Sequence, residues 1–130
     1  MAARHWSSQF VGLPYSHDDM DCAALCERVQ REIYGRTLRL PRERATGYRG
    51  QSRQILAHRD AVATITETPR EGDGVLMIGR GHINHIGIYC MIGTEAWVLH
   101  AMKSAGHVVL HRLRSLPAVG LTVEGFYRWN

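Results

Sequence analysis

The chain has 130 residues, 45% of them hydrophobic, and a formal net charge of +4 at pH 7. This length predicts a single domain over residues 1–130 with an ordinary buried core, so disulfide staples are not needed for stability. No stretch approaches the roughly 20 apolar residues of a membrane-spanning helix, which excludes a membrane span. Three cysteines cannot all pair, which favours reduced thiols.

The N-terminal segment Met1–Phe10 carries charged and aromatic side chains but lacks the apolar core of a signal peptide. We therefore expect a soluble protein that is made in the cytoplasm, where thiols stay reduced. Any export would then need a carrier machine.

The positive charge comes almost entirely from arginine and is concentrated between Arg36 and Arg59. Arginine clusters suit phosphate and carboxylate groups, which makes an acidic polymer a conceivable partner. An excess of four charges is nevertheless common on unrelated soluble domains, and the chain shows no nucleic-acid-binding motif. We therefore expect no nucleic-acid partner and interpret the cluster as a solvated face.

The first predicted element is an amphipathic helix from about Asp21 to Tyr34. Asp18, Asp19 or Asp21 can cap its N-terminus, and Gly35 is a suitable C-terminal stop because glycine readily adopts the left-handed cap conformation. The apolar positions of this helix recur at intervals of three and four: Cys22, Cys26, Val29 and Ile33.

The rest of the chain predicts an exposed arginine-rich loop at 37–50, a short helix around Ser52 to Val62 and a turn at 71–74. Five runs rich in β-branched or aromatic residues then follow, separated by turn residues. The predicted strands are Val75–Ile78, Ile83–Ile92, Ala96–Met102, Val108–Leu113 and Thr122–Trp129.

Strands joined by short turns are most simply arranged as an antiparallel meander, with the helices against one face. The fold class predicted is therefore α+β, with N-terminal helices packed on a sheet of about five strands. Alternation along one strand puts His85 and Gly87 on the face away from the isoleucines. Glycine at 87 would leave room beside His85 for another chain or for a side chain such as Cys22.

Cys22 stands at the predicted start of the helix and is the candidate nucleophile. A free thiol has a pKa of about 8.5 and is mostly protonated at neutral pH. The unpaired N–H groups of a helix N-terminus favour the thiolate, and an imidazole can take up the thiol proton. Two histidines on downstream strands, His85 and His100, are the candidates for that imidazole and its support.

Four short stretches of the chain carry a resemblance to a known family. They are Val11–Tyr15, Asp21–Leu25, Gly72–Asp73 and His85–Tyr89, the last followed by Leu99-His100-Ala101. In this order and spacing the chain resembles the NlpC-type cell-wall peptidases, which are compact papain-like cysteine enzymes. It is most similar to the phage tail-associated versions, which often end in a segment like Val123–Arg128.

The resemblance implies a cysteine peptidase that hydrolyses an amide in the stem peptide of bacterial peptidoglycan, typically between D-γ-glutamate and a diamino acid such as meso-diaminopimelate. By the same resemblance Cys22 is the nucleophile and His85 accepts the thiol proton and later delivers it to the leaving amine. His100 orients His85 through the other ring nitrogen.

The family also implies that Tyr15 and Asp21 line the substrate cleft and hold the free amine of the stem peptide. The backbone N–H of Cys22 is expected to form the oxyanion hole, and no metal or other cofactor is required. The chain departs from the family at Ala23-Ala24, where Ser-Gly is common. This removes a hydroxyl near the substrate and can shift which stem peptide is accepted.

The expected partners are peptidoglycan stem peptides and phage tail-tip or delivery-machine proteins. Without a signal peptide, delivery in a virion tail would bring the enzyme to the periplasm and cell wall. Two alternatives stay open: a non-catalytic tail-assembly module of the same fold that docks a neighbour, and a thiol amide hydrolase acting on another substrate, such as a lipid or a protein glutamine.

Less specific interpretations apply to the remaining cysteines and histidines. Cys22, Cys26, His82 and His85 could form a zinc site of the Cys2His2 kind, but zinc thiolate pairs usually come from a tight turn and this pair falls on a helix. Cys26 and Cys90 are expected to be inert core thiols. Four histidines show no partner pattern and are expected to be surface or sheet residues: His17, His58, His107 and His111.

Overall fold

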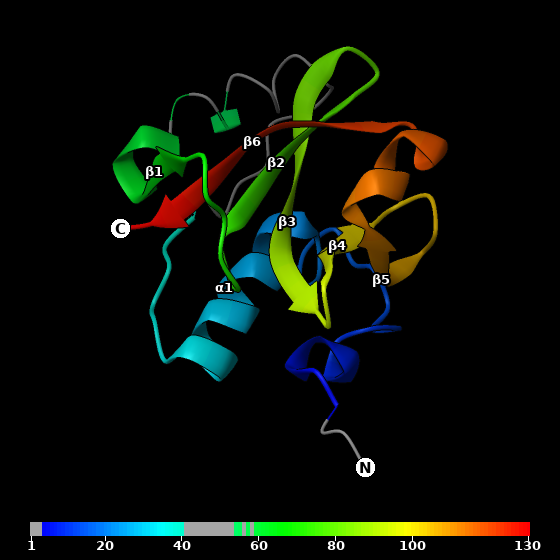
Figure 1. The fold of residues 1–130 in the computed structure, drawn as a ribbon, viewed down its shortest axis with the longest axis horizontal. Helices are drawn as coiled ribbons and strands as arrows, with labels where there is room; N and C mark the ends of the chain where they lie inside the picture. The colour runs from blue at the N-terminus through cyan, green and yellow to red at the C-terminus, as the bar shows by residue number, and fades with distance from the viewer. Residues whose placement is uncertain (1–3, 41–53, 56, 58) are drawn as a thin grey trace.

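The structure of the protein, a computed structural model, describes residues 4–40, 54, 55, 57 and 59–130 (Figure 1). It is an α+β fold in which one long helix packs against an open antiparallel sheet. In chain order the elements are η1 (Trp6–Gln9), α1 (Cys22–Tyr34), β1 (Ala63–Thr66), β2 (Gly74–Gly79), β3 (His82–Ile92), β4 (Glu95–Met102), β5 (His107–Arg112), η2 (Leu113–Val119) and β6 (Leu121–Trp129).

The predicted N-terminal helix is confirmed as α1, with both of its ends explained by single residues. The side chain of Asp21 caps the helix by accepting a hydrogen bond of 2.8 Å from the backbone N–H of Ala24. Gly35 ends it in the left-handed conformation, with a φ of 62°. Cys26 and Val29 are fully buried, as the spacing predicted, whereas Cys22 and Ile33 are half-buried. Leu25, which was not among the predicted positions, is also fully buried.

The six strands are all antiparallel and lie in the order β1-β6-β2-β3-β4-β5. The predicted meander is correct for β2 to β5 and wrong for the last strand, because β6 returns across the sheet to pair with β2 rather than with β5. The sixth strand, β1, was not predicted. It is four residues long and alternates alanine and isoleucine with threonine, a signal too short to stand out.

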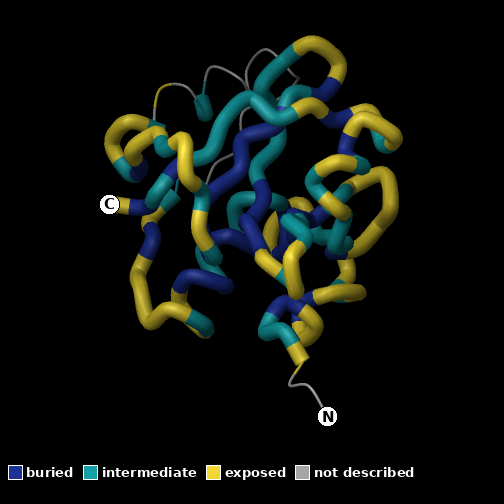
Figure 2. Tube along the Cα trace, in the orientation of Figure 1, coloured by how far each residue is buried: buried dark blue, intermediate teal, exposed yellow. Residues whose placement is uncertain are grey.

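Buried hydrophobic side chains form two clusters, one on each face of the sheet. Figure 2 shows that the buried residues are concentrated in the central strands. The face under α1 packs against Leu25 and Val29 of the helix. The opposite face packs against η2, whose Leu113, Leu116 and Val119 recur every three residues. The expectation that helices cover one face only is therefore wrong, because the segment joining β5 to β6 crosses the second face.

Gly72 joins α1 to the sheet just before β2 begins. Its carbonyl accepts hydrogen bonds from the Gln30 side chain of α1, at 2.9 Å, and from the Trp129 indole of β6, at 3.0 Å. Its φ of 89° suits glycine, and a Cβ at this position would stand 2.7 Å from the ring of Tyr34. The Gly72-Asp73 pair recognised in the sequence therefore fixes the position of the helix.

Parts of two predicted segments lie outside the described residues. Most of the arginine-rich loop predicted at 37–50 lies outside the described residues. A short helix was predicted around Ser52 to Val62, and its described residues, 54, 55, 57 and 59–62, are helical. Among the helices of the described residues, none combines the length and the apolar character needed to cross a membrane.

Candidate active site

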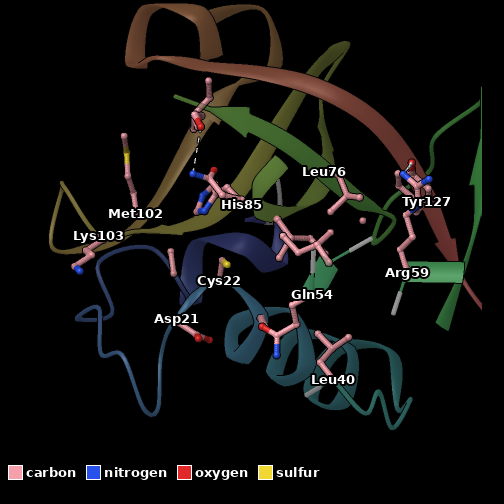
Figure 3. Close-up of a pocket in the computed structure, with 18 of the residues that line it drawn as sticks. Asp21, Cys22, Leu40, Gln54, Arg59, Leu76, His85, Met102, Lys103 and Tyr127 are labelled. Carbon is pink, nitrogen blue, oxygen red and sulfur yellow. Dashed lines mark hydrogen bonds between the residues drawn. The ribbon is translucent and has the colours of Figure 1, made fainter. Parts of the chain in front are cut away.

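A cavity of about 930 Å³ opens beside the N-terminus of α1 and is lined by residues from α1, β2, β3 and β6. Its size falls within the usual range of roughly 300–1,000 Å³ for ligand sites. Four of the five residues selected from the sequence line it: Tyr15, Asp21, Cys22 and His85. Figure 3 shows Cys22 and His85 between Lys103 at one end of the view and Arg59 at the other.

Cys22 is the first residue of α1 and the most accessible of the three thiols. It is half-buried and borders the cavity, whereas Cys26 and Cys90 are completely buried. Burial raises the pKa of both Cys26 and Cys90, which favours the protonated thiol. The prediction that they are core residues is confirmed, and their lack of reactivity stays a prediction.

The sheet opens between β3 and β4 at the level of the two histidines. The register pairs of these strands run from Ile92 with Glu95 to Ile88 with Leu99 and end there. Beyond this point the first half of β3 pairs only with β2, and the last residues of β4 pair only with β5. His85 and His100 lie beyond the last pair, on the parts of β3 and β4 that are not paired with one another.

The two histidines are joined by a direct hydrogen bond. Nε2 of His85 lies 2.7 Å from Nδ1 of His100, with the rings roughly perpendicular. His100 is fully buried, and its second nitrogen, Nε2, lies 2.9 Å from Nδ1 of His111 on β5. Three imidazoles therefore form a continuous chain from the cavity into the sheet.

Burial keeps these imidazoles neutral. Desolvation lowers the pKa of His85 to about 4. Desolvation, together with the neighbouring His85 and His111, lowers the pKa of His100 to about 2. At neutral pH His85 is therefore unprotonated, which is the state in which an imidazole can accept a proton from a thiol.

Gly87 leaves room for the neighbouring strands. A Cβ at this position would lie 2.5 Å from Cγ1 of Val98, 3.0 Å from Cε of Met77 and 3.0 Å from the carbonyl of Leu99. Of the two expected occupants of the space at Gly87, another stretch of chain is the one observed: β2 and β4 fill it, and Cys22 does not. Glycine is needed there because the neighbouring strands pack so closely.

Tyr15 and Asp21 reach the cavity by separate routes. Tyr15 lies on the N-terminal segment that pairs with the edge of β5, where its backbone N–H donates to the Gly106 carbonyl at 2.9 Å. Asp21 is buried, with a relative exposure of 6%, and uses one carboxylate oxygen as the helix cap. The structure brings both to the cavity, and their roles in substrate binding stay predictions.

Comparison with known proteins gives one match: the model of the NlpC/P60 family matches residues 12–118. The chain belongs to the NlpC/P60 family. This family is typically one of cysteine peptidases and suggests activity on peptidoglycan of the cell wall. No curated protein and no solved structure gives a significant match to the chain.

The NlpC/P60 match includes all five residues predicted for the site and also His111, which sequence reasoning had placed among the histidines without a partner. A signal for it did exist. The β4–β5 hairpin pairs His100 with Val109, so His111 lies two residues along the same face.

Metal-binding potential lies elsewhere in this NlpC/P60 chain. Among the described residues, ligand atoms of three or more metal-binding side chains gather only at His5, Glu71 and Cys90. The Glu71 carboxylate there already accepts hydrogen bonds from the Trp6 indole and the Met91 backbone and contacts His5. The zinc site considered from the sequence, with Cys22 and Cys26, is not among such groups.

The buried histidine predicts a pH dependence of stability. The pKa of His100 is lower in the folded protein than its ordinary value near 6.5, so the unfolded chain takes up a proton first as the pH falls. Stability should be constant above about pH 6.5 and decline below it, with His100 contributing about 1.4 kcal/mol per pH unit. Urea denaturation of the wild type and of His100→Asn between about pH 7 and about pH 4 measures this difference in slope.

Replacement of the exposed His107 by asparagine is the matched control. That variant should keep the wild-type slope. Equal slopes for the wild type and His100→Asn would contradict the assignment of a neutral, buried imidazole.

Proposed function

We propose that the protein is a cysteine peptidase that cleaves an amide bond in peptidoglycan stem peptides, with Cys22, His85 and His100 as its catalytic group. The observation that carries the proposal is that Cys22 and His85 line one cavity while His85 is hydrogen-bonded to the fully buried His100. The NlpC/P60 membership supports the same reaction class.

The proposed reaction begins with transfer of the Cys22 thiol proton to His85. Because Nε2 of His85 bonds to His100, Nδ1 is the nitrogen that would receive this proton. The thiolate attacks the amide carbonyl, and the backbone N–H of Cys22 is expected to stabilise the oxyanion. His85 then protonates the leaving amine, and water hydrolyses the thioester, which returns the proton to the enzyme.

The proposed bond is the one between D-γ-glutamate and a diamino acid. The carboxylate of Asp21 stands at the cavity and would pair with the free amine of the stem peptide. Tyr15 lines the same cavity and would complete this subsite. The first turn carries Ala23 in place of the serine common in the family, so the peptide would be held there without a hydroxyl.

The first experiment incubates defined stem peptides and muropeptides with the protein and with Cys22→Ala, followed by mass spectrometry. We expect a product of cleavage at the γ-glutamyl bond from the wild type and none from the variant, because the thiolate forms the covalent intermediate. The same samples are treated with iodoacetamide to report the reactivity of the thiol.

If the peptides are not cleaved although Cys22 reacts with iodoacetamide, the protein would be a thiol hydrolase that acts on a different amide substrate. No cleavage and an unreactive thiol would favour the non-catalytic docking module. The variant Cys22→Ser, which keeps a side chain of similar size, controls for changes in packing at the start of α1.

The role of Asp21 is tested by Asp21→Asn. Asparagine caps helices as well as aspartate does, so α1 should keep its stability while the negative charge is lost. Loss of a charge-assisted hydrogen bond costs roughly 1.5–3 kcal/mol, which predicts a KM raised at least about tenfold for peptides with a free N-terminal amine. Steady-state kinetics with free and N-acetylated peptides measure the effect.

N-acetylated peptides provide the internal control, since they have no charge for Asp21 to bind. Their KM should be the same for the wild type and Asp21→Asn. An equal change for free and acetylated peptides would show that Asp21 acts through the helix and not through the amine.

We also propose that the enzyme is carried in a phage tail tip or similar injection device and acts on the cell wall from the periplasm. The likeness of segment 123–128 to tail-associated versions of the family motivates this proposal. An antibody against the protein should detect it in purified tails, and those tails should release muropeptides from isolated walls. Its absence from particles, with activity confined to the cytoplasm, would contradict this route.

A further inference from the structure

His111 extends the pair of histidines at the site to a third imidazole. Its Nδ1 lies 2.9 Å from Nε2 of His100, and the two ring centroids are 5.1 Å apart. His111 is only partly buried, whereas His100 between the other two is completely enclosed. The row of imidazoles therefore runs from the cavity across three neighbouring strands, β3, β4 and β5, to a residue with access to solvent.

A neutral imidazole has one N–H donor and one acceptor nitrogen. His100, held neutral by burial, can therefore donate to only one of its two neighbours and must accept from the other. The two hydrogen bonds between the three imidazoles therefore run in the same direction. The donor N–H groups point either toward His111 in both bonds or toward His85 in both bonds. The direction of one bond fixes the direction of the next.

Only one of the two directions leaves His85 able to act as a base toward Cys22. When the bonds point toward His111, His85 donates from Nε2 and keeps a lone pair on Nδ1. When they point the other way, His85 accepts at Nε2, and its proton sits on Nδ1. In that tautomer it has no lone pair to offer the thiol.

We propose that His111 is a positioning residue. It accepts a hydrogen bond from Nε2 of His100 and thereby sets the tautomers of His100 and His85. When His111 becomes protonated, the direction of both hydrogen bonds between the three imidazoles reverses. The proposal rests on the proposed function for the roles of Cys22 and His85. A protonated His111 donates from both nitrogens, so His100 must then accept at Nε2 and donate from Nδ1 to His85. His85 then carries its proton on Nδ1 and can no longer accept the thiol proton of Cys22. This change needs no movement of the backbone.

The charges around His111 agree with a neutral resting state. Elements β4 and η2 and the N-terminal segment at Gly12 and Leu13 pack against β5. The titratable or charged residues of β4, the start of η2 and β5 itself are Glu95, His100, Arg114, His107 and Arg112, and of these His100 contacts His111. The Glu95 carboxylate forms salt bridges with Arg114, at 2.7 Å, and with Arg112, at 3.4 Å. Desolvation lowers the pKa of His111, so at neutral pH it accepts from His100.

The test is the rate at which iodoacetamide alkylates Cys22, measured against pH in the wild type, His111→Leu and His111→Asn. Leucine removes the acceptor, whereas the amide oxygen of asparagine can take the place of Nδ1. We expect His111→Leu to lose about tenfold in rate at pH 7, equivalent to about 1.4 kcal/mol. We expect His111→Asn to stay within about threefold of the wild type and, because it cannot be protonated, to remain reactive to lower pH.

Alkylation needs no peptide substrate, so its result stands whichever amide the enzyme cleaves. Peptide mapping confines the signal to Cys22, and Cys22→Ala gives the background. A His111→Leu profile equal to that of the folded wild type would overturn the positioning role. A wild-type Cys22 no more reactive at pH 7 than a free thiol would overturn both this proposal and the proposed base.

Nitrogen NMR of the wild-type imidazoles tests the same proposal without any substitution, which covers the case in which His111→Leu fails to fold. We expect the protons of His85, His100 and His111 all on Nε2 at neutral pH. We expect His100 to move its proton to Nδ1 as His111 is protonated. A proton on Nδ1 of His100 at neutral pH would overturn the proposal.

Discussion

The Gly72 carbonyl is the point on which the arrangement of the site depends. It accepts one hydrogen bond from Gln30 of α1 and another from Trp129 of β6, and both donors are buried. An unpaired buried amide costs roughly 1–3 kcal/mol, so the helix cannot shift along the sheet without losing one of these bonds. Since α1 carries Cys22 and the sheet carries His85, this carbonyl fixes the position of the proposed nucleophile relative to its proposed base.

The second constraint is the end of the pairing between β3 and β4 at Ile88 and Leu99. Beyond this pair, His85 and His100 are joined through their side chains. Desolvation keeps both imidazoles neutral. The hydrogen bond and the burial together give the proposed base its orientation and its protonation state.

Local signals predicted α1 and five of the six strands well, because Asp21, Gly35 and the alternation of side chains act within a few residues. The pairing of β6 with β2 was not predictable in this way, since it depends on η2 crossing the far face. The crowding at Gly87 and the contact of His111 with His100 also depend on neighbouring strands. The residues of the candidate site could be chosen from their order in the sequence. Which of their side chains are in contact depends on how the strands pair in the sheet.

The N-terminal segment has an effect on how copies of the protein can associate. Gly12 and Leu13 exchange backbone hydrogen bonds with Val108, so part of the outer edge of β5 is already paired. Exposed strand edges are where sheets of separate molecules join. In the described part of the chain the other outer strand is β1, only four residues long, with Ile65 67% exposed. The edge of β1 is therefore less protected against pairing with another sheet than the covered part of the β5 edge.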